Sequence, residues 1–325
     1  MVAFLVGLIG ALVLATPAVS LAQAYPARPI SLVVPFAAGG ATDALARQFA
    51  ERMSSVSKQT FLVENTPGAG GTVGAARVAK AKSDGYTLLV GHIGYMAAAP
   101  ALYKQLPYNP VQDFEAVARF PDTPLVLIVG RNSRFASIQS LMEYAKLNPG
   151  KVNIGNAGVG SAGHLVAALF ASALKTEVTH VSYKGNAPAL VDIISGRIDG
   201  MFDQSNTALP QMRGEKVMAL ATTSTDRLPQ MPNVPTLGES GLPGFEATTW
   251  YGIYAPKGTP REHIDWIFAQ FKEAMDDPAF TGKLVEQGYV LVKPELRTSA
   301  ALAMHTRREV DLWKKVIADA GISPN

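Results

Sequence analysis

Short runs of apolar residues alternate along the chain with longer segments in which apolar positions recur every three or four residues. A short apolar run bounded by turn residues is typical of a buried strand, whereas the longer spacing is typical of a helix with one buried face. The expected strands of the first half of the chain are 29–36, 59–65, 86–92 and 124–130. A helical pattern follows the first of these strands, and a second helical pattern, which follows the last of them, ends at an Asn-Pro-Gly sequence.

The second half repeats the alternation. Residues 187–196 have a helical pattern that ends at Gly196, and residues 261–277 and 301–321 have the pattern of amphipathic helices. The expected strands here are 152–157, 178–183, 198–203 and 217–223. Strands that alternate with helices indicate an α/β fold, and we expect parallel sheets joined by crossover helices.

Three of the connections between a strand and a helix are rich in glycine and small residues. Glycine permits a tight turn, and the helix that follows directs unpaired N–H groups and the positive end of its dipole into the loop. The three loops are 37–43, 66–74 and 156–163, and none contains Lys or Arg. We therefore expect an anion to be held there by backbone N–H groups and by hydroxyls such as those of Thr42, Thr72 and Ser161. The alternative is that these are ordinary turns whose polar residues only cap helices.

One of these loops contains the G-x-G-x-x-G spacing of dinucleotide-binding enzymes, at Gly158, Gly160 and Gly163. A nicotinamide dinucleotide site also needs an acidic residue about 20 positions further on, at the far end of the next strand, to hold the ribose. Glu177 has the right separation but precedes the expected strand, and the far end carries Tyr183 instead. We therefore interpret the motif as a glycine-rich anion loop and expect no NAD and no other cofactor.

Signals for catalysis and for metal binding are weak. Ser161 lies in a Val-Gly-Ser-Ala-Gly sequence that lacks the first glycine of a hydrolase nucleophile elbow. Because His164 opens a helix, we expect it to be neutral, since the helix dipole disfavours a positive charge there. The histidines show no metal-binding spacing, and they are His92, His164, His180, His263 and His305. For His92, Tyr183 and Asp203, which end strands, both a ligand contact and a structural role stay open.

Composition narrows the function further. The net charge is only +3, and no stripe of basic and aromatic residues indicates nucleic-acid binding. The first 24 residues carry no charged side chain, and residues 22–24 form an Ala-Gln-Ala sequence, so we expect a signal peptide cleaved after Ala24 and a periplasmic protein. The alternative is an uncleaved membrane anchor. The absence of cysteine fits a large exported domain that is stable without disulfides.

Several long stretches resemble one family. They are YPARPISLVVPFAAGGATDALARQFAERM, VENTPGAGGTVGAARVAKAKSDGYTLLVG, LYKQLPYNPVQDFEAVA, HVSYKGNAPALVDIISGRIDGMFDQ and PNVPTLGESGLPGFEATTWYGIYAPKGTP. The chain resembles, over residues 25–325, the Bug-type extracytoplasmic solute-binding receptors of tripartite tricarboxylate transporters. The resemblance implies a two-lobed periplasmic-binding-protein fold of type II, a Venus flytrap with a hinge between its lobes. We expect residues 25–125 and 248–325 to form one lobe and 126–247 the other, because 124–130 and the TTWYGIYAPKG stretch look like paired strands that flank an inserted middle.

The resemblance also implies where a ligand contacts each lobe. In the first lobe the implied residues are Phe36, Ala37, Gly39, Gly40, Thr42, Asp43, Gly91, His92 and Tyr95, with residues 68–74 nearby. In the second lobe they are Gly158, Ser161, Ala162, His164, Tyr183, Gly185 and Asp203. The chain departs from the family at His92 and Tyr95, where small or hydroxyl residues are common, and at the acidic Asp122 before the crossover strand.

The function that follows is a binding protein rather than an enzyme. We expect a monomer that captures a small organic carboxylate in the cleft between its lobes and delivers it to the membrane subunits of a tripartite tricarboxylate transporter. Two alternatives stay open: a periplasmic enzyme that uses the same cleft, and a ligand-sensing subunit for a signalling system.

Overall fold

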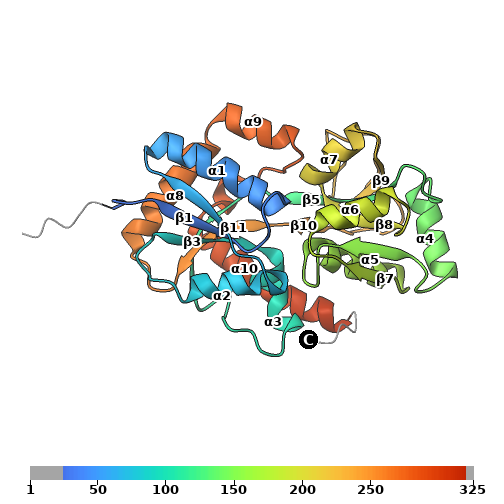
Figure 1. Cartoon of the computed structure of the whole chain (residues 1–325), viewed down its shortest axis with the longest axis horizontal. Coiled ribbons are helices and arrows are strands. Elements are labelled where there is room, and N and C mark those ends of the chain that lie inside the picture. The colour runs from blue at the N-terminus through green and yellow to red at the C-terminus, as the bar shows by residue number, and fades with distance from the viewer. Residues whose placement is uncertain (1–24, 320–325) are drawn as a thin grey trace, which may run out of the picture.

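The computed structural model describes residues 25–319, and within this range the chain forms two α/β lobes side by side (Figure 1). The first sheet has the strand order β2-β1-β3-β11-β4. Its strands are β1 (Ile30–Val34), β2 (Phe61–Asn65), β3 (Thr87–His92), β4 (Phe114–Arg119) and β11 (Tyr251–Pro256). The first lobe therefore combines strands from both ends of the described chain.

The second sheet has the order β10-β5-β8-β6-β7, with β9 also paired to β5. Its strands are β5 (Thr123–Gly130), β6 (Asn153–Asn156), β7 (Thr179–Ser182), β8 (Gly200–Gln204), β9 (Val217–Thr222) and β10 (Thr248–Thr249). The chain passes from the first sheet to the second between β4 and β5, and it returns between β10 and β11. Two adjacent connections of this kind are the arrangement that a hinge requires.

The expected strands are confirmed, but the expectation of parallel sheets is wrong in part. The pairs β1–β2, β1–β3, β6–β7 and β6–β8 are parallel. The strands that enter each lobe from the other run antiparallel to their neighbours: β5 pairs antiparallel with β8 and β9, and β11 with β3 and β4. Both sheets are mixed because these strands start at the junction of the lobes instead of following a crossover helix.

Helices cover both sheets (Figure 1). The longer ones are α1 (Ala41–Ser57), α2 (Thr72–Ala79), α4 (Ile138–Leu147), α5 (Ala162–Leu174), α6 (Asn186–Ile194), α7 (Ser205–Arg213), α8 (Arg261–Met275), α9 (Pro278–Glu286) and α10 (Ser299–Asp319). Short helical turns are η1 (Ala69–Gly71), η2 (Gly94–Ala98), α3 (Ala99–Leu102) and η3 (Pro294–Leu296). The C-terminal helix α10 packs on β4, η2 and α3 of the first lobe.

The junction between the lobes contains polar contacts between buried or half-buried side chains. Arg119 at the end of β4 forms an ion pair of 2.7 Å with Asp122 just before β5. Trp250, which lies between β10 and β11, donates a hydrogen bond of 3.1 Å from Nε1 to Glu309 of α10. Asp122 therefore has a structural partner at the junction, which accounts for an acidic residue at this place.

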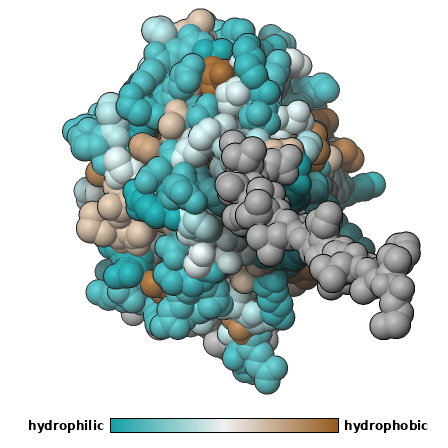
Figure 2. Space-filling view, turned by 90° about the vertical axis from the view of Figure 1, so that its left-hand side faces the viewer, coloured by the Kyte–Doolittle hydropathy of each residue, from teal (hydrophilic) through white to brown (hydrophobic). Residues whose placement is uncertain are grey.

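The outer end of the first lobe is largely hydrophilic, with hydrophobic residues scattered over it (Figure 2). Among residues 25–319, no helix is both long and apolar enough to span a membrane. The expected signal peptide, residues 1–24, lies outside the described residues.

Candidate functional site

The parallel strands of both sheets end at the junction of the lobes, and each carries a loop that leads into a helix. In the first lobe, β1 leads through residues 35–40 into α1, whose N-cap is Gly40. In the second lobe, β6 leads through residues 157–161 into α5, whose N-cap is Ser161. Ligands of α/β proteins bind beyond the carboxyl ends of the strands, where helix N-termini offer unpaired N–H groups. Each lobe thus carries a loop of the same kind, which ends at the N-terminus of a helix.

The loop of the second lobe contacts two other segments of the first lobe, at Gly70 in η1 and at Gly94 in η2. A Cβ atom placed on Gly70 would lie 2.7 Å from the carbonyl oxygen of Val159 in the other lobe. A Cβ atom on Gly94 would overlap the carbonyl oxygen of Gly160. Because both neighbours are backbone atoms, a side chain at either glycine would separate the lobes. The conformation is therefore a closed one, and glycine at these positions permits it.

Asp43 holds the loop of the first lobe together. Its buried carboxylate accepts hydrogen bonds of 2.9 Å from Gly39 N, from Arg47 Nε and from Asn65 Nδ2. Burial alone would raise the pKa of this carboxyl, but the hydrogen bonds from Arg47, Gly39 and Asn65 outweigh it and hold the pKa below its usual value. Asp43 is thus a charged group neutralised within its own lobe, and it fixes the backbone N–H groups next to it.

The loop of the second lobe is fixed in a similar way without a charge. Asn156 Oδ1 accepts hydrogen bonds of 3.0 Å from Gly158 N and from Ser182 Oγ. Ser161 Oγ accepts a hydrogen bond of 3.3 Å from His164 N and so caps α5. A capping hydroxyl uses its lone pair, and its proton is still able to donate to a ligand. The capping role and the ligand role of Ser161 are therefore compatible.

His92 ends β3 among aromatic rings and is neutral. Burial lowers the pKa of its imidazole to about 3. Nδ1 accepts a hydrogen bond of 2.9 Å from Gly94 N, so the proton lies on Nε2. The rings of Phe36, Tyr95 and Tyr251 surround it at centroid distances of 5.2 to 5.6 Å. His92 is thus a neutral donor in an aromatic wall.

His164 is also neutral, as its position at the start of a helix predicts. Burial lowers the pKa of His164 to about 4, and the neighbouring His180, whose ring centroid is 4.9 Å away, acts in the same direction. Its Nδ1 faces Gly160 N at 3.4 Å. Both His92 and His164 are therefore uncharged near neutral pH.

Polar groups from both lobes meet where β8 ends and β11 begins. Gln204 Nε2 at the end of β8 donates a hydrogen bond of 2.8 Å to the hydroxyl of Tyr251 in the first lobe. Asp203 is fully buried, and burial raises its pKa to about 6 although Thr207, Gln204 and Asn186 hydrogen-bond to it. Sequence reasoning missed Gln204 and Tyr251, because only the fold shows that the ends of β8 and β11 face each other.

Some residues expected at the ligand have partners of their own. The hydroxyl of Tyr183 donates to Asp192 at 2.8 Å, on the outer side of α6. The Tyr95 ring is fully buried, and its hydroxyl donates to Val90 O. Gly91 lies in β3, where a Cβ atom would overlap the ring of Tyr254. These three residues support the walls of the cleft, and Gly185, with φ +117°, forms the turn into α6.

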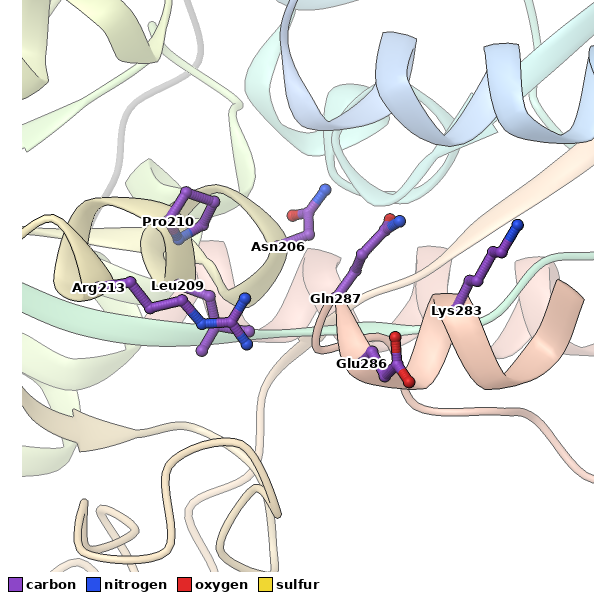
Figure 3. A pocket seen from close by; sticks show the side chains of 7 residues that line it. All are labelled: Asn206, Leu209, Pro210, Arg213, Lys283, Glu286 and Gln287. Atoms are coloured by element: carbon purple, nitrogen blue, oxygen red, sulfur yellow. The ribbon is translucent and has the colours of Figure 1, made fainter. Parts of the chain in front are cut away.

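No metal site accompanies this arrangement within residues 25–319, since no group of three or more His, Asp or Glu side chains lies close enough together. A separate pocket of about 180 Å³ lies between the lobes at α7 and α9. Side chains of α7 approach it from one side and those of α9 from the other (Figure 3). It is lined by Asn206, Leu209, Pro210, Arg213, Lys283, Glu286 and Gln287. None of the residues implied by the family resemblance lines it.

Comparison with known proteins gives a consistent result. Residues 45–322 match the family described as "Tripartite tricarboxylate transporter family receptor". The chain is similar to the periplasmic binding protein BugD (38% identity, 93% of this chain and 100% of the other, TM-score 0.86). It is similar to MatC from Rhodopseudomonas palustris with bound malate (36% identity, 90% of this chain and 100% of the other, TM-score 0.84). It is also similar to Rpa4515 of R. palustris with adipate (34% identity, 93% of this chain and 100% of the other, TM-score 0.87).

Proposed function

The chain belongs to the receptor family of tripartite tricarboxylate transporters, whose members are periplasmic solute-binding proteins, and on this premise we propose that it binds a small dicarboxylate between its lobes. The bound acid is then delivered to the membrane subunits of a tripartite transporter. We further propose that the receptor works as a monomer and that residues 25–125 and 248–325 move as one lobe against 126–247.

One observation carries the proposal about the ligand. Two glycine-rich loops, one from each lobe and each leading into the N-terminus of a helix, contain no Lys or Arg. Each helix N-terminus offers unpaired N–H groups and the positive end of its dipole, which stabilise a carboxylate without a cation. A ligand with two carboxylates can contact both lobes at once, and so stabilises the closed conformation.

The ligands of two similar proteins support the size of the ligand that we propose for this chain. MatC is described with malate and Rpa4515 with adipate, which are dicarboxylates of four and six carbons. We propose that the carboxylates contact the loops and that the aromatic wall packs against the carbon chain. The direct contacts we propose are Phe36, Ala37, Gly39, Gly40, Thr42 and His92 from the first lobe and Gly158, Ser161, Ala162 and His164 from the second. Asp43, Gly91, Tyr95, Tyr183, Gly185 and Asp203 act by positioning these groups.

We also propose that the cleft has no catalytic activity. The serine of the cleft accepts its hydrogen bond from a backbone N–H, and its nearest histidine has Nδ1 directed at Gly160 N. An activated nucleophile needs a base within hydrogen-bond reach, and this geometry favours binding over catalysis. A sensing subunit would use the same cleft and differs only in its partner.

We also propose that the protein is exported to the periplasm and that its signal peptide is cleaved after Ala24. The mature chain would then begin at Tyr25, whose ring stacks on His263 at a centroid distance of 3.8 Å and whose hydroxyl donates to Gly85 O at 2.8 Å. A mature N-terminus that starts with an anchored aromatic residue supports this cleavage site. N-terminal sequencing of the protein isolated from the periplasm tests it.

A thermal-shift screen of organic acids tests the function. A ligand that binds only the native state raises the melting temperature in a saturable way. We expect stabilisation by malate, adipate or an acid of similar length, and no change in the acid when it is recovered after incubation. Turnover of the stabilising acid would instead support the enzyme, and no stabilisation by any dicarboxylate would contradict the proposal.

A further inference from the structure

A groove of about 470 Å³ lies on the surface of the first lobe, away from the residues proposed to contact the ligand. One wall is the segment of residues 100–112 and the other is α10. Its lining includes the apolar side chains of Leu106, Val111 and Val310, which are half-buried or buried. Nothing in the proposed binding of a dicarboxylate uses this groove.

The rim of the groove is basic. Lys104 lies on one wall and Arg307 and Lys314 on the other, and all three side chains are exposed. Within residues 25–319, none of the three forms an ion pair, whereas the neighbouring Arg308 lies 3.9 Å from Glu309. Asp311 is the one acidic residue among the described lining residues. Unpaired cations on both walls of a groove are complementary to an acidic peptide segment.

The wall formed by residues 100–112 is hydrogen-bonded to the segments that meet the second lobe. Tyr103 donates its hydroxyl proton to Ala69 O at 3.0 Å, next to Gly70, which touches Val159 across the cleft. Tyr108 donates to Tyr95 O at 2.6 Å. Tyr95 follows Gly94, the other glycine that meets the second lobe. This wall is therefore hydrogen-bonded at two points to residues that adjoin the contacts between the lobes, at Gly70 and Gly94.

We propose that this groove docks an acidic extracytoplasmic segment of the transporter's membrane subunits, an inference that rests on the proposed function. A transporter must distinguish the closed, loaded receptor from the open one. A segment bound in the groove lies against Tyr103 and Tyr108, whose hydroxyls hydrogen-bond to residues that adjoin the contacts between the lobes. The affinity of the receptor for the segment therefore depends on closure of the lobes. Leu106, Val111 and Val310 contact apolar residues of the segment, and the three cations pair with its carboxylates.

The test compares two variants with the same change of net charge. One is the triple variant Lys104→Glu, Arg307→Glu, Lys314→Glu. The control carries Lys146→Glu, Lys151→Glu and Lys216→Glu, which are exposed residues of the second lobe. Binding of the full chain to nanodiscs that hold the membrane subunits is measured in saturating malate or adipate, and dicarboxylate binding is measured separately by calorimetry. Protein-free nanodiscs of phosphatidylglycerol serve as a second surface.

We expect the groove variant to bind the membrane subunits at least about tenfold more weakly than wild type, whereas the control binds like wild type. Both should keep wild-type affinity for the dicarboxylate. Equal binding of the groove variant and wild type to the subunits would overturn the docking proposal and leave the proposed function intact. Wild-type binding to the lipid nanodiscs that is equally lost in the groove variant would overturn it in favour of a membrane surface. If wild type bound dicarboxylate but no transporter subunit, the delivery step of the proposed function would fail as well.

Discussion

Uncharged groups dominate the cleft at the level of single residues. His92 and His164 are neutral, and the carboxylate of Asp43 is paired with Arg47 inside its own lobe. A hydrogen bond to a charged group contributes more than one between neutral groups, so a few backbone N–H groups and hydroxyls suffice for a carboxylate. Recognition by neutral donors also limits the cost of desolvation when the cleft closes.

Replacement of Ser161 by alanine tests the hydroxyl of the second lobe. Loss of a hydrogen bond to a charged group costs about 1.5–3 kcal/mol, so Ser161→Ala should weaken dicarboxylate binding roughly 10- to 150-fold by calorimetry. The variant also loses a helix cap. Ser137→Ala is the matched control, because Ser137 caps α4 in the same lobe at a distance from the cleft loops. Unchanged affinity in Ser161→Ala would leave the residue with its capping role alone.

Replacement of Gly40 by valine tests the backbone approach in the first lobe. Gly40 has φ −82° and ψ 172°, which valine adopts readily, and a Cβ atom there would meet only Ala37 O, at 3.7 Å. We therefore expect Gly40→Val to fold and to lose dicarboxylate binding, since the side chain fills space that the ligand needs. Circular dichroism and calorimetry separate the two effects. The control is Gly282→Val in α9, where a Cβ atom meets no neighbour within 4 Å; wild-type affinity in Gly40→Val would show that the ligand does not approach this loop.

The buried His92 predicts a dependence of stability on pH. Its pKa is about 3 in the folded protein, against 6.5 for a histidine in water, so the unfolded chain binds the extra proton between these values. The free energy of unfolding is therefore unaffected by His92 above pH 6.5 and falls below it, by up to about 1.4 kcal/mol per pH unit. Urea unfolding of wild type and His92→Gln at several pH values should show a shallower fall in the variant. Identical slopes would mean that His92 is not held neutral.

At the level of elements, the closed conformation depends on glycines that let backbone meet backbone. Gly94 starts η2 in a conformation that alanine can adopt, and its missing side chain leaves room for Gly160 O of the other lobe. The contact is between lobes, so a substitution here affects closure more than the fold of either lobe.

Gly94→Ala should therefore weaken ligand binding without unfolding the protein. Overpacking by one methyl group costs about 1–3 kcal/mol, and only in the closed state, which corresponds to roughly 5- to 150-fold in affinity. The melting temperature without ligand should stay close to that of wild type. Gly282→Ala is the control with open space around it. If Gly94→Ala bound the dicarboxylate like wild type, the contact with Gly160 would not belong to the ligand-bound state.

The same elements show what the sequence could predict. Apolar runs identified strands such as β1, β5 and β8 because their residues are buried in a sheet, and the amphipathic patterns identified α8 and α10 because each has one buried face. The patterns did not reveal α7, which has Pro210 in its interior, or α9, in which Leu284 is the one buried residue. Strand direction was wrong for β5 and β11, since a local pattern carries no information on where the chain crosses between lobes.

The candidate site was predictable to the same extent. The glycine loops stood out because only glycine permits their turns and close approaches. The contact of Gln204 with Tyr251 joins residues 47 positions apart, and the pairing of Tyr183 with Asp192 turns its hydroxyl away from the cleft. Both depend on tertiary contacts that no short motif encodes.

At the level of the whole molecule, capture between the lobes requires that a dicarboxylate shifts the receptor from an open to a closed conformation. The chain has no cysteine, so two introduced cysteines are the only sites for thiol-reactive spin labels. Val73 in α2 and Ser172 in α5 are exposed residues on different lobes. Their helices directly follow the two segments that contact each other between the lobes, at Gly70 and at Val159. Neither residue belongs to the proposed ligand contacts.

The distance distribution between labels at Val73→Cys and Ser172→Cys, measured by pulsed electron paramagnetic resonance, is the most direct test of the central claim. The sample is titrated with whichever of malate and adipate raises the melting temperature, and NAD is the control ligand. We expect a shift of the population to shorter distances that saturates with the dicarboxylate, no shift with NAD, and no shift when Gly40→Val is added. A distribution that stays the same while the dicarboxylate is bound would contradict capture by closure of the two lobes.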